Sequence, residues 1–515
     1  MPAHFQKFLN FLQVASSRDA LLAQHFGGHV KKRPAHDFLD RWEAMIQQVR
    51  QAFSAKNAEI FLVTSPETFA LNEAVRSIQS LSRSVPEMQI SAIVLNRVVM
   101  APGHCTDCGR RRKAAEKTER FLRKNFPGIP VLLGVDPGNP ILGVGVLRHF
   151  GESVFGKKTK IPKHRAKLVL PSPRGKTGPN FQAQPWPAAE SALSFTVGKG
   201  GVGKTTTTAA LAFHSRATQS TVPVTVCSTD PAPSLDDIFR ELVGDARTMV
   251  LGDPGFTAVE IDSVAEFRQW AARIKTQLDS ELSLDSGGLH VDLTFEKQVF
   301  AALMEVAPPG VDEVFAIFRI LDLLRDGGKV LIDMAPTGHA LELLRMPERI
   351  QLWSRLLLKS LASHRNLALA QDVAVEIASL GQEVRKLIVA MRDPERSRIW
   401  AVMLPEPVPD RQTRRLIDAV EKLGLKVDSL LINRVRFPQQ PEAACEWCAR
   451  SVAWQRATLQ SIAGKYHRYQ LFIAPEMPQE VPRFRFLDTL GYNAQAHAVR
   501  QLDGRGDDGR GIRGG

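Results

Sequence analysis

The sequence has 515 residues, of which 44% are apolar, and a formal net charge of +13. This length allows two or more domains of ordinary size, and the composition excludes a disordered or fibrous protein. Because the sequence has no run of about eighteen apolar residues and no N-terminal signal peptide, we expect a cytoplasmic protein.

The N-terminal part alternates between strand and helix patterns. Residues 1–59 are predicted to be helical, with apolar side chains mostly three and four positions apart. The predicted strands that follow are 60–64, 90–96 and 131–135, and the predicted helices are 68–84 and 110–124. We expect the strand at 60–64 to be buried. Strands that alternate with helices favour a parallel α/β sheet.

A basic segment comes next. Between Gly151 and Thr177, eight Lys and Arg residues are accompanied by a single acidic residue, Glu152, and Pro and Gly are frequent. This composition is typical of a solvated linker, which we place at residues 152–190. A nucleic-acid patch is the alternative, but no specific nucleic-acid partner is expected.

A phosphate-binding loop is predicted at the sequence SFTVGKGGVGKTTTT, residues 194–208. A short apolar strand leads into the pattern G-x-x-x-x-G-K-[ST], and an Ala-rich helix follows. Glycines let successive N–H groups turn toward a phosphate, Lys204 supplies a counter-charge, and the Thr205 hydroxyl suits Mg²⁺. The residues expected to contact the nucleotide here are Gly198, Gly200, Gly201, Val202, Gly203, Lys204, Thr205 and Thr206.

Two aspartates follow predicted apolar strands in the same part of the chain. Asp230 comes after the strand at 222–228, and Asp333 ends the strand that begins at Val330. A carboxylate at the carboxyl end of a strand beside a phosphate-binding loop suits phosphoryl transfer. We expect Asp230 to orient the attacking water and Asp333 to hold Mg²⁺ through water, together with Thr205. The alternative for either aspartate is a helix N-cap or a turn residue.

The chain contains an internal repeat. IFLVTSPE at 60–67 aligns with IWAVMLPE at 399–406, SAIVLNRV at 91–98 aligns with DSLLINRV at 428–435, and two C-x-x-C pairs are 340 residues apart. The predicted domains are an incomplete first half (1–151), the linker (152–190), a complete second half (191–495) and a disordered tail (496–515). The first half lacks the loop and both switch regions, for which we favour a mis-set start codon or a split gene over a natural half-domain.

A family resemblance rests on the order of several motifs. KGGVGKTT, STDPAPSLDD, APPGVDE and DMAPTGH resemble the arsenite-transporting and tail-anchored-protein-targeting ATPases, which have a deviant Walker A loop. The resemblance implies a P-loop NTPase fold with a parallel β-sheet flanked by helices, ATP and Mg²⁺ as cofactors, and ATP hydrolysis coupled to closure of two halves. It also implies that Lys199 joins Lys204 and Asp230 in catalysis, by reaching the nucleotide of a partner across a homodimer interface.

The resemblance further assigns residues to base recognition. It implies that Asn433 reads the adenine edge and that Pro475 lies in the segment lining the adenine pocket, while residues 337–339 sense the γ-phosphate. The first half keeps an equivalent asparagine, Asn96, which we interpret as structural.

Proteins of this family couple ATP hydrolysis to one of two main processes, arsenite transport or the targeting of tail-anchored proteins. Arsenite activation requires cysteine thiolates, but residues 231–444 contain no cysteine, and Cys227 lies on a strand predicted to be buried. Targeting requires an apolar groove, for which the candidates are 297–304 and one helical face; ordinary core packing is the alternative. That face consists of Ile350, Trp353, Leu357 and Leu361.

The function predicted from the sequence is an ATPase of the arsenite-pump and targeting family. Its expected partner is a membrane efflux subunit or a membrane-protein client. The alternatives are a targeting or chaperone factor for hydrophobic membrane-protein segments, and a nucleotide-gated binding module with little turnover.

The cysteine pairs suggest a zinc site. One C-x-x-C pair supplies two of the four ligands of a tetrahedral Zn²⁺, and in homodimers of this family the pair meets its symmetry mate. Here Cys105 and Cys108 of the first half would join Cys445 and Cys448 of the second half in one chain. The alternatives are thiol pairs without metal and a pairing between two chains.

Overall fold

The structure is a computed structural model of the chain. It describes residues 9, 34–54, 58–84, 90–100, 105–156, 189–230, 235–263, 265–269, 272, 311–361, 368–436 and 445–476. The apolar patch at 297–304, the tail at 496–515 and all but the ends of the linker at 152–190 therefore lie outside the described residues.

The chain divides into two compact units. One consists of residues 1–60, 80–89 and 262–316. Its α3 (Pro34–Ser54) buries Leu39 and Ile46 in a small apolar cluster. The other unit consists of residues 61–79, 90–261 and 317–515, and it contains the phosphate-binding loop and the four paired cysteines.

An eight-stranded sheet forms the centre of the second half, with the strand order β11-β10-β9-β4-β8-β5-β7-β6. Every neighbouring pair is parallel except β6 and β7, which form a hairpin at the edge. The strands are β4 (Leu193–Gly198), β5 (Val224–Ser228), β6 (Thr248–Val250), β7 (Asp253–Glu260), β8 (Lys329–Asp333), β9 (Ser397–Met403), β10 (Val427–Val435) and β11 (Gln470–Pro475). The parallel α/β fold expected from the sequence is confirmed.

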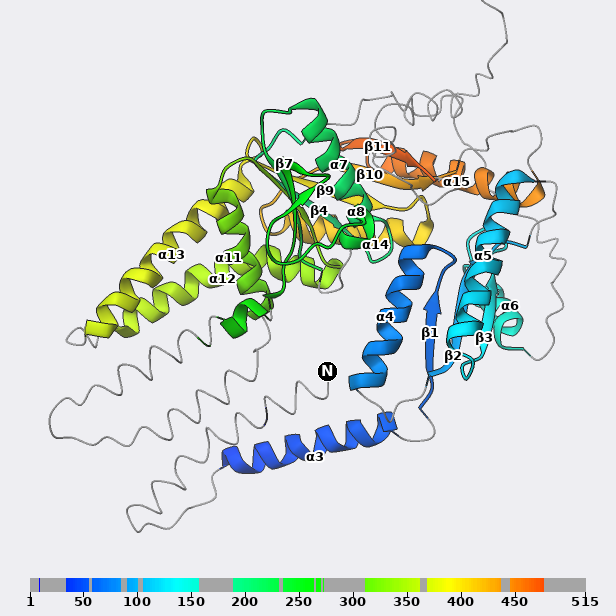
Figure 1. Cartoon of the computed structure of the whole chain (residues 1–515), viewed down its shortest axis with the longest axis horizontal. Coiled ribbons are helices and arrows are strands. Elements are labelled where there is room, and N and C mark those ends of the chain that lie inside the picture. Colours follow the sequence, from blue (N-terminus) through cyan, green and yellow to red (C-terminus); the bar gives the residue numbers. More distant parts are fainter. Residues whose placement is uncertain are drawn as a thin grey trace, which may run out of the picture. The chain divides into compact units, whose positions relative to one another are not determined.

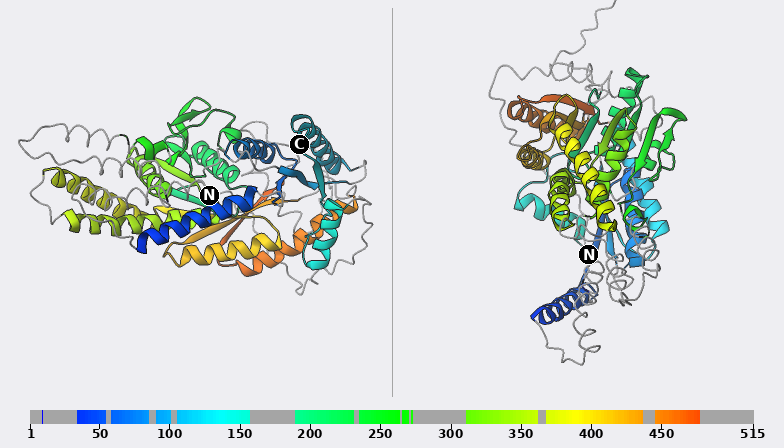
Figure 2. Two further views of the ribbon diagram at one scale, coloured as in Figure 1. Left: turned by 90° about the horizontal axis from the view of Figure 1, so that it is seen from below. Right: turned by 90° about the vertical axis from the view of Figure 1, so that its left-hand side faces the viewer.

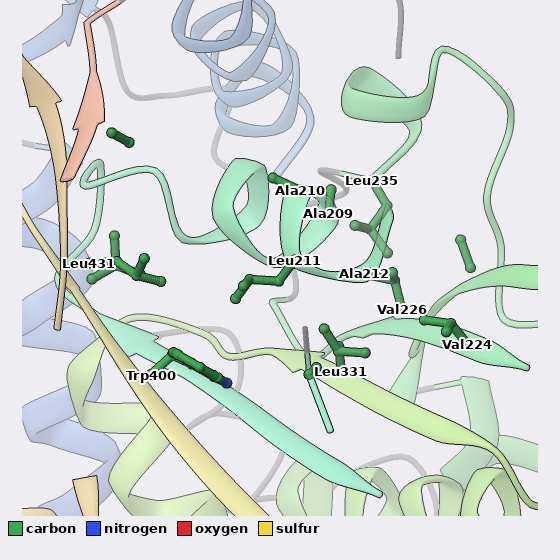
Figure 3. Packing of buried hydrophobic residues seen from close by; sticks show 14 of the residues in the cluster. Ala209, Ala210, Leu211, Ala212, Val224, Val226, Leu235, Leu331, Trp400 and Leu431 are labelled. Carbon is green, nitrogen blue, oxygen red and sulfur yellow. The ribbon is translucent and has the colours of Figure 1, made fainter. Parts of the chain in front are cut away.

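The core of this half lies between the sheet and α7 (Lys204–Thr218) (Figure 3). Ala209, Ala210 and Ala212 let the helix approach the strands closely, and Leu211 is fully buried. Across from the helix, Trp400 of β9 is also fully buried, and the cluster continues along β5, β8 and β10. Close packing of this kind fixes the helix that begins at the phosphate-binding loop.

The remaining helices of the second half are α8 (Leu235–Phe239), α11 (Val311–Arg325), α12 (Thr337–Leu361), α13 (Ala368–Arg392), α14 (Pro407–Glu421) and α15 (Glu446–Lys465). The long α12 and α13 lie side by side (Figure 1, Figure 2). No described helix is both long and apolar enough to cross a membrane.

A three-stranded sheet forms the first half, with the order β1-β2-β3. Its elements are β1 (Ile60–Thr64), α4 (Thr68–Ser84), β2 (Ile90–Val98), α5 (Thr106–Asn125), β3 (Val131–Val135) and α6 (Val144–Phe155). The prediction that strand 60–64 is buried was wrong: Phe61 is 41% and Val63 is 60% exposed. Because β1 is an edge strand of this short sheet, only part of its surface is covered by described residues.

The two sheets repeat the same local geometry. Both β2 and β10 end in Asn-Arg-Val, and the arginines, Arg97 and Arg434, have positive φ angles of 61° and 58°. A positive φ is uncommon for a residue with a Cβ, so its recurrence at equivalent positions supports the repeat seen in the sequence.

Candidate functional site

The phosphate-binding loop lies at the carboxyl end of β4, which is buried along its whole length between β8 and β9. Gly203 caps α7 with a φ of 90°, and a Cβ at this position would overlap the Asn433 side chain. Only glycine fits both requirements. Lys204, the first residue of α7, is 6% exposed and thus lies inside the loop rather than on the surface.

Asp333 ends β8, the strand next to β4, and its Cα pairs in register with Thr196. The side chain is fully buried, and neither carboxylate oxygen has a hydrogen-bond partner of normal geometry among the described residues. Burial raises the pKa of Asp333 from 3.8 to about 7, although Thr205 and Lys204 act in the opposite direction. An unpaired carboxylate beside a threonine hydroxyl is a suitable donor set for a hard cation such as Mg²⁺.

Asp230 follows β5, the next strand of the sheet. Thr229 joins the two strand ends, because its N–H donates to the Asp333 carbonyl oxygen over 2.9 Å. The Asp230 N–H lies 3.3 Å from the Ser228 hydroxyl. Asp230 and Asp333 therefore come from adjacent strands at the carboxyl edge of the sheet, the edge where ligands of open α/β folds bind.

Asn433 lies directly against the phosphate-binding loop. Its amide Nδ2 donates to the Val202 carbonyl oxygen over 2.9 Å, and its Oδ1 accepts the Arg434 N–H over 2.8 Å. Pro475 ends β11, and its Cα pairs with Val435, two residues after Asn433. The structure therefore brings the two residues expected at the adenine to neighbouring strand ends.

The second lysine of the loop, Lys199, has a different position. Its side chain is exposed, whereas Lys204 is buried. The segment at 337–339, which is expected to sense the γ-phosphate, begins α12; His339 is exposed, and the side chain of Thr337 lies outside the described residues.

Four cysteines from the two halves meet in one cluster, with all four sulfur atoms within 4.8 Å of one another. Cys105 and Cys445 are the N-caps of α5 and α15, and Cys108 and Cys448 lie in the first turns. The shorter sulfur separations are 3.7 Å (Cys105–Cys448) and 3.4 Å (Cys108–Cys445 and Cys108–Cys448). Four thiolates around one Zn²⁺ at 2.3 Å are about 3.8 Å apart, so the donor set and its dimensions suit zinc.

The thiols of the cluster differ in acidity. Burial disfavours the Cys105 thiolate, but the backbone N–H groups of Cys108 and Cys445 outweigh it and lower the pKa of Cys105 to about 7. Burial and the neighbouring thiols raise the pKa of Cys108, and burial raises the pKa of Cys448 to about 12. Because thiolates bind metal, a cation at this cluster would compete with the protons of its thiols.

The sequence analysis missed a buried ionic cluster next to the cysteines. Glu476 directly follows Pro475 and pairs with Arg111 of α5 at 2.9 Å and with Arg436 at 2.5 Å. Burial opposes its ionisation, but Arg436 and Arg111 lower the pKa of Glu476 to about 2. The position of Glu476 after a predicted site residue was the available signal; its partner Arg111, 365 residues away, was not identifiable from the sequence.

Comparisons with known proteins agree with this geometry. A model of the anion-transporting ATPase family matches residues 1–154 and 192–493. The chain is 26% identical over 306 residues to ATPase GET3 of Chaetomium globosum, 28% over 306 residues to an ATPase ASNA1 homolog of Dictyostelium discoideum, and 25% over 305 residues to ATPase ASNA1 homolog 1 of Paramecium tetraurelia. Each match covers 56% of this chain and 85%, 84% and 87% of the relative, in that order. The chain is an ATPase and belongs to the anion-transporting ATPase family.

Proposed function

We propose that the chain is an ATP-driven targeting factor for hydrophobic membrane-protein segments, working in the cytoplasm. The nucleotide part of this proposal is supported by the position of Lys204, Asp230, Asp333 and Asn433, which all lie at the carboxyl ends of parallel strands in one sheet. The relatives reported above are ATPases named GET3 or ASNA1 homolog rather than arsenite pumps, which favours the targeting branch of the family.

The cysteines of the chain argue against a metalloid as the activating ligand. Residues 231–444 contain none. Cys227 is fully buried on β5, and this burial raises the pKa of its thiol to about 12. A neutral, enclosed thiol is a poor ligand for arsenite, which binds thiolates.

Each residue of the site has its own role in ATP hydrolysis. Lys204 neutralises the phosphates, Asn433 orients the base, and Asp230 orients the attacking water. Thr205 and Asp333 would hold Mg²⁺, which supplies charge stabilisation for the leaving phosphate when it is bound. For this Asp333 must be ionised; its burial opposes ionisation, whereas Thr205 and Lys204 favour it. Lys199, exposed on the loop, serves the nucleotide of a second chain in a homodimer formed through the second halves.

The client would bind on the pair α12 and α13. Leu352, Val375 and Val389 are 55%, 70% and 59% exposed on these helices. Ile350, one member of the face expected from the sequence, is buried at 4% and therefore contributes to the core rather than to a groove. The side chains of Trp353, Leu357 and Leu361 lie outside the described residues.

Client binding is tested with a fluorescent peptide that contains one membrane-spanning segment. We expect the Asp230→Asn variant to retain the peptide with ATP and to release it with ADP, and the Lys204→Ala variant to show no nucleotide effect. A peptide that binds equally in every state, together with an ATPase rate stimulated by antimonite, would identify a metalloid pump instead. A rate close to zero at every protein concentration would indicate a binding module with little turnover.

We also propose that the four cysteines hold one Zn²⁺ within a single chain. The evidence is their position on the two halves, their burial and the fit of the sulfur separations to a tetrahedral site. The metal would fix the first turns of α5 and α15 to each other, and so join the halves.

The test is zinc content measured on a monomeric fraction. One Zn²⁺ per chain, lost in both Cys105→Ser and Cys445→Ser, supports the site. The matched control is Cys227→Ser, which removes a buried thiol outside the cluster and should leave the zinc content unchanged. Zinc that survives Cys105→Ser, or half stoichiometry in dimers, contradicts a site within one chain.

A further inference from the structure

The two halves are joined by a reciprocal pair of ion pairs. Arg434 near the end of β10 binds Glu67 of the first half through two hydrogen bonds. Its Nη1 donates to Oε1 over 2.8 Å and its Nη2 donates to Oε2 over 2.7 Å. The equivalent residues with exchanged halves are Arg97 and Glu406, whose nearest nitrogen and oxygen atoms are 3.6 Å apart. The repeat therefore produces the same pairing twice. We call Arg434–Glu67 the tight pair and Arg97–Glu406 the loose pair.

The tight pair adjoins the phosphate-binding loop through one residue. Arg434 has a φ of 58°, a conformation that is unfavourable for a residue with a side chain. In this conformation its N–H donates to the Oδ1 of Asn433, and the Nδ2 of Asn433 donates to the Val202 carbonyl oxygen. The bidentate contact to Glu67 holds the Arg434 side chain, and with it the backbone that orients the Asn433 amide.

The oriented amide leaves a defined pair of groups for a ligand. A primary amide has two N–H donors and two acceptor lone pairs, and the described contacts of Asn433 use one of each. The remaining N–H and lone pair are then available to the adjacent acceptor and donor of an adenine. This step rests on the proposed function, in which Asn433 reads the base.

We propose that Glu67 of the incomplete first half is a positioning residue for base recognition in the second half. It touches neither base nor phosphate. It acts through Arg434 on the orientation of Asn433, so the first half contributes to nucleotide selectivity although it lacks a phosphate-binding loop of its own. Loss of Glu67 should therefore weaken the binding of the base and leave the binding of the triphosphate unchanged.

The loose pair offers a matched control. The Oδ1 of Asn96 accepts the Arg97 N–H over 2.9 Å, as the Oδ1 of Asn433 accepts the Arg434 N–H. Among the described residues, however, the Asn96 amide has no hydrogen bond to a phosphate-binding loop. Instead Asn96, Arg97 and Glu406 line a cavity of about 250 Å³ together with Asp136 and Arg436. Glu406→Gln thus removes an equivalent carboxylate from the interface without touching the nucleotide site.

The experiment measures the Kd of ATP and of inorganic tripolyphosphate by calorimetry on the full chain. For Glu67→Gln we expect ATP to bind about tenfold more weakly, since a charge-assisted bidentate contact is lost, and tripolyphosphate to change by less than about twofold. For Glu406→Gln we expect both Kd values to stay at the parent level. In a double-mutant cycle of Glu67→Gln and Arg434→Lys, the double variant should bind ATP no more weakly than the single variant with the higher Kd.

Three results would overturn this role of Glu67. The first is an unchanged ATP Kd in Glu67→Gln, and the second is equal weakening of ATP and tripolyphosphate, which would place the effect on the loop or the fold. The third is an equal effect of Glu406→Gln. Asn433→Ala separates this inference from the proposed function: if it fails to reduce the preference for ATP over tripolyphosphate, the role of Asn433 itself is wrong.

Discussion

Asp333 offers a prediction about stability that follows from its burial. Its pKa is raised from 3.8 to about 7, so the folded chain binds a proton between these values that the unfolded chain has released. The stability of the folded state therefore decreases as the pH rises from 3.8 to about 7 and is constant above that range. The unpaired carboxylate destabilises the nucleotide-free protein most at neutral and alkaline pH.

The substitution Asp333→Asn removes this charge. A difference of about three pH units corresponds to about 4 kcal/mol at pH 8, which is an upper limit for the stabilisation. The Asn amide is itself buried without partners, and this costs about 1–3 kcal/mol. We therefore expect a net gain of about 1–3 kcal/mol at pH 8, or a rise in Tm of about 2–10 °C, together with loss of Mg²⁺-dependent hydrolysis.

The assay is thermal unfolding of parent and variant at pH 5 and pH 8, without nucleotide or Mg²⁺. Asp410→Asn is the control, because Asp410 is similarly buried at 6% but paired with Lys465 at 2.5 Å and Tyr466 at 2.9 Å. It should lower the Tm, since a satisfied contact is lost. A Tm for Asp333→Asn at pH 8 that is equal to or below the parent value, or an equal rise at pH 5, would refute this account of Asp333.

Other substitutions separate the roles of the remaining groups. Lys204→Ala should abolish nucleotide binding in calorimetry, whereas Asp230→Asn should bind ATP like the parent and lose turnover, because only the water-orienting carboxylate is lost; turnover at the parent rate would reject Asp230. Glu476 has its pKa lowered from 4.5 to about 2, so it stabilises the fold above pH 4.5 and loses that effect as the pH falls toward 2. Glu476→Gln should therefore lower the Tm at pH 7 but much less at pH 3, and an equal loss at both would contradict the ion pairing. Antimonite should leave the ATPase rate unchanged, and strong stimulation would argue for a metalloid ligand.

Local patterns predicted those parts of the fold that are determined locally. The strand, glycine loop and Ala-rich helix at 194–213 have distinct periodicities and fixed glycine requirements, so β4 and α7 were predictable. The hairpin of β6 and β7 was not predicted, although Leu251 and Gly252, both with positive φ, form the turn expected at such a place. The exposure of β1 also escaped prediction, because an apolar strand sequence does not reveal whether its sheet continues on both sides.

Contacts between the halves depend on tertiary structure and left weaker signals. The cysteine pairs were matched because both carry the same short motif at equivalent positions. Glu67 and Arg434 have no such motif, and a single charged residue at a strand end is compatible with many partners. The cavity beside Asn96 and the ionic cluster around Glu476 likewise appear only when the two halves pack together.

The cysteine cluster and Lys199 lead to opposite expectations about protein concentration. All four cysteines belong to one chain, so their local concentration is set by the connection between the halves and not by dilution. Lys199, if it serves the nucleotide of a second chain, acts only when two chains meet, and the specific ATPase rate should fall on dilution. The zinc content per chain should meanwhile stay constant over the same range. If both quantities fall together, the cysteines also assemble between chains, and the first half does not complete a metal site for the second.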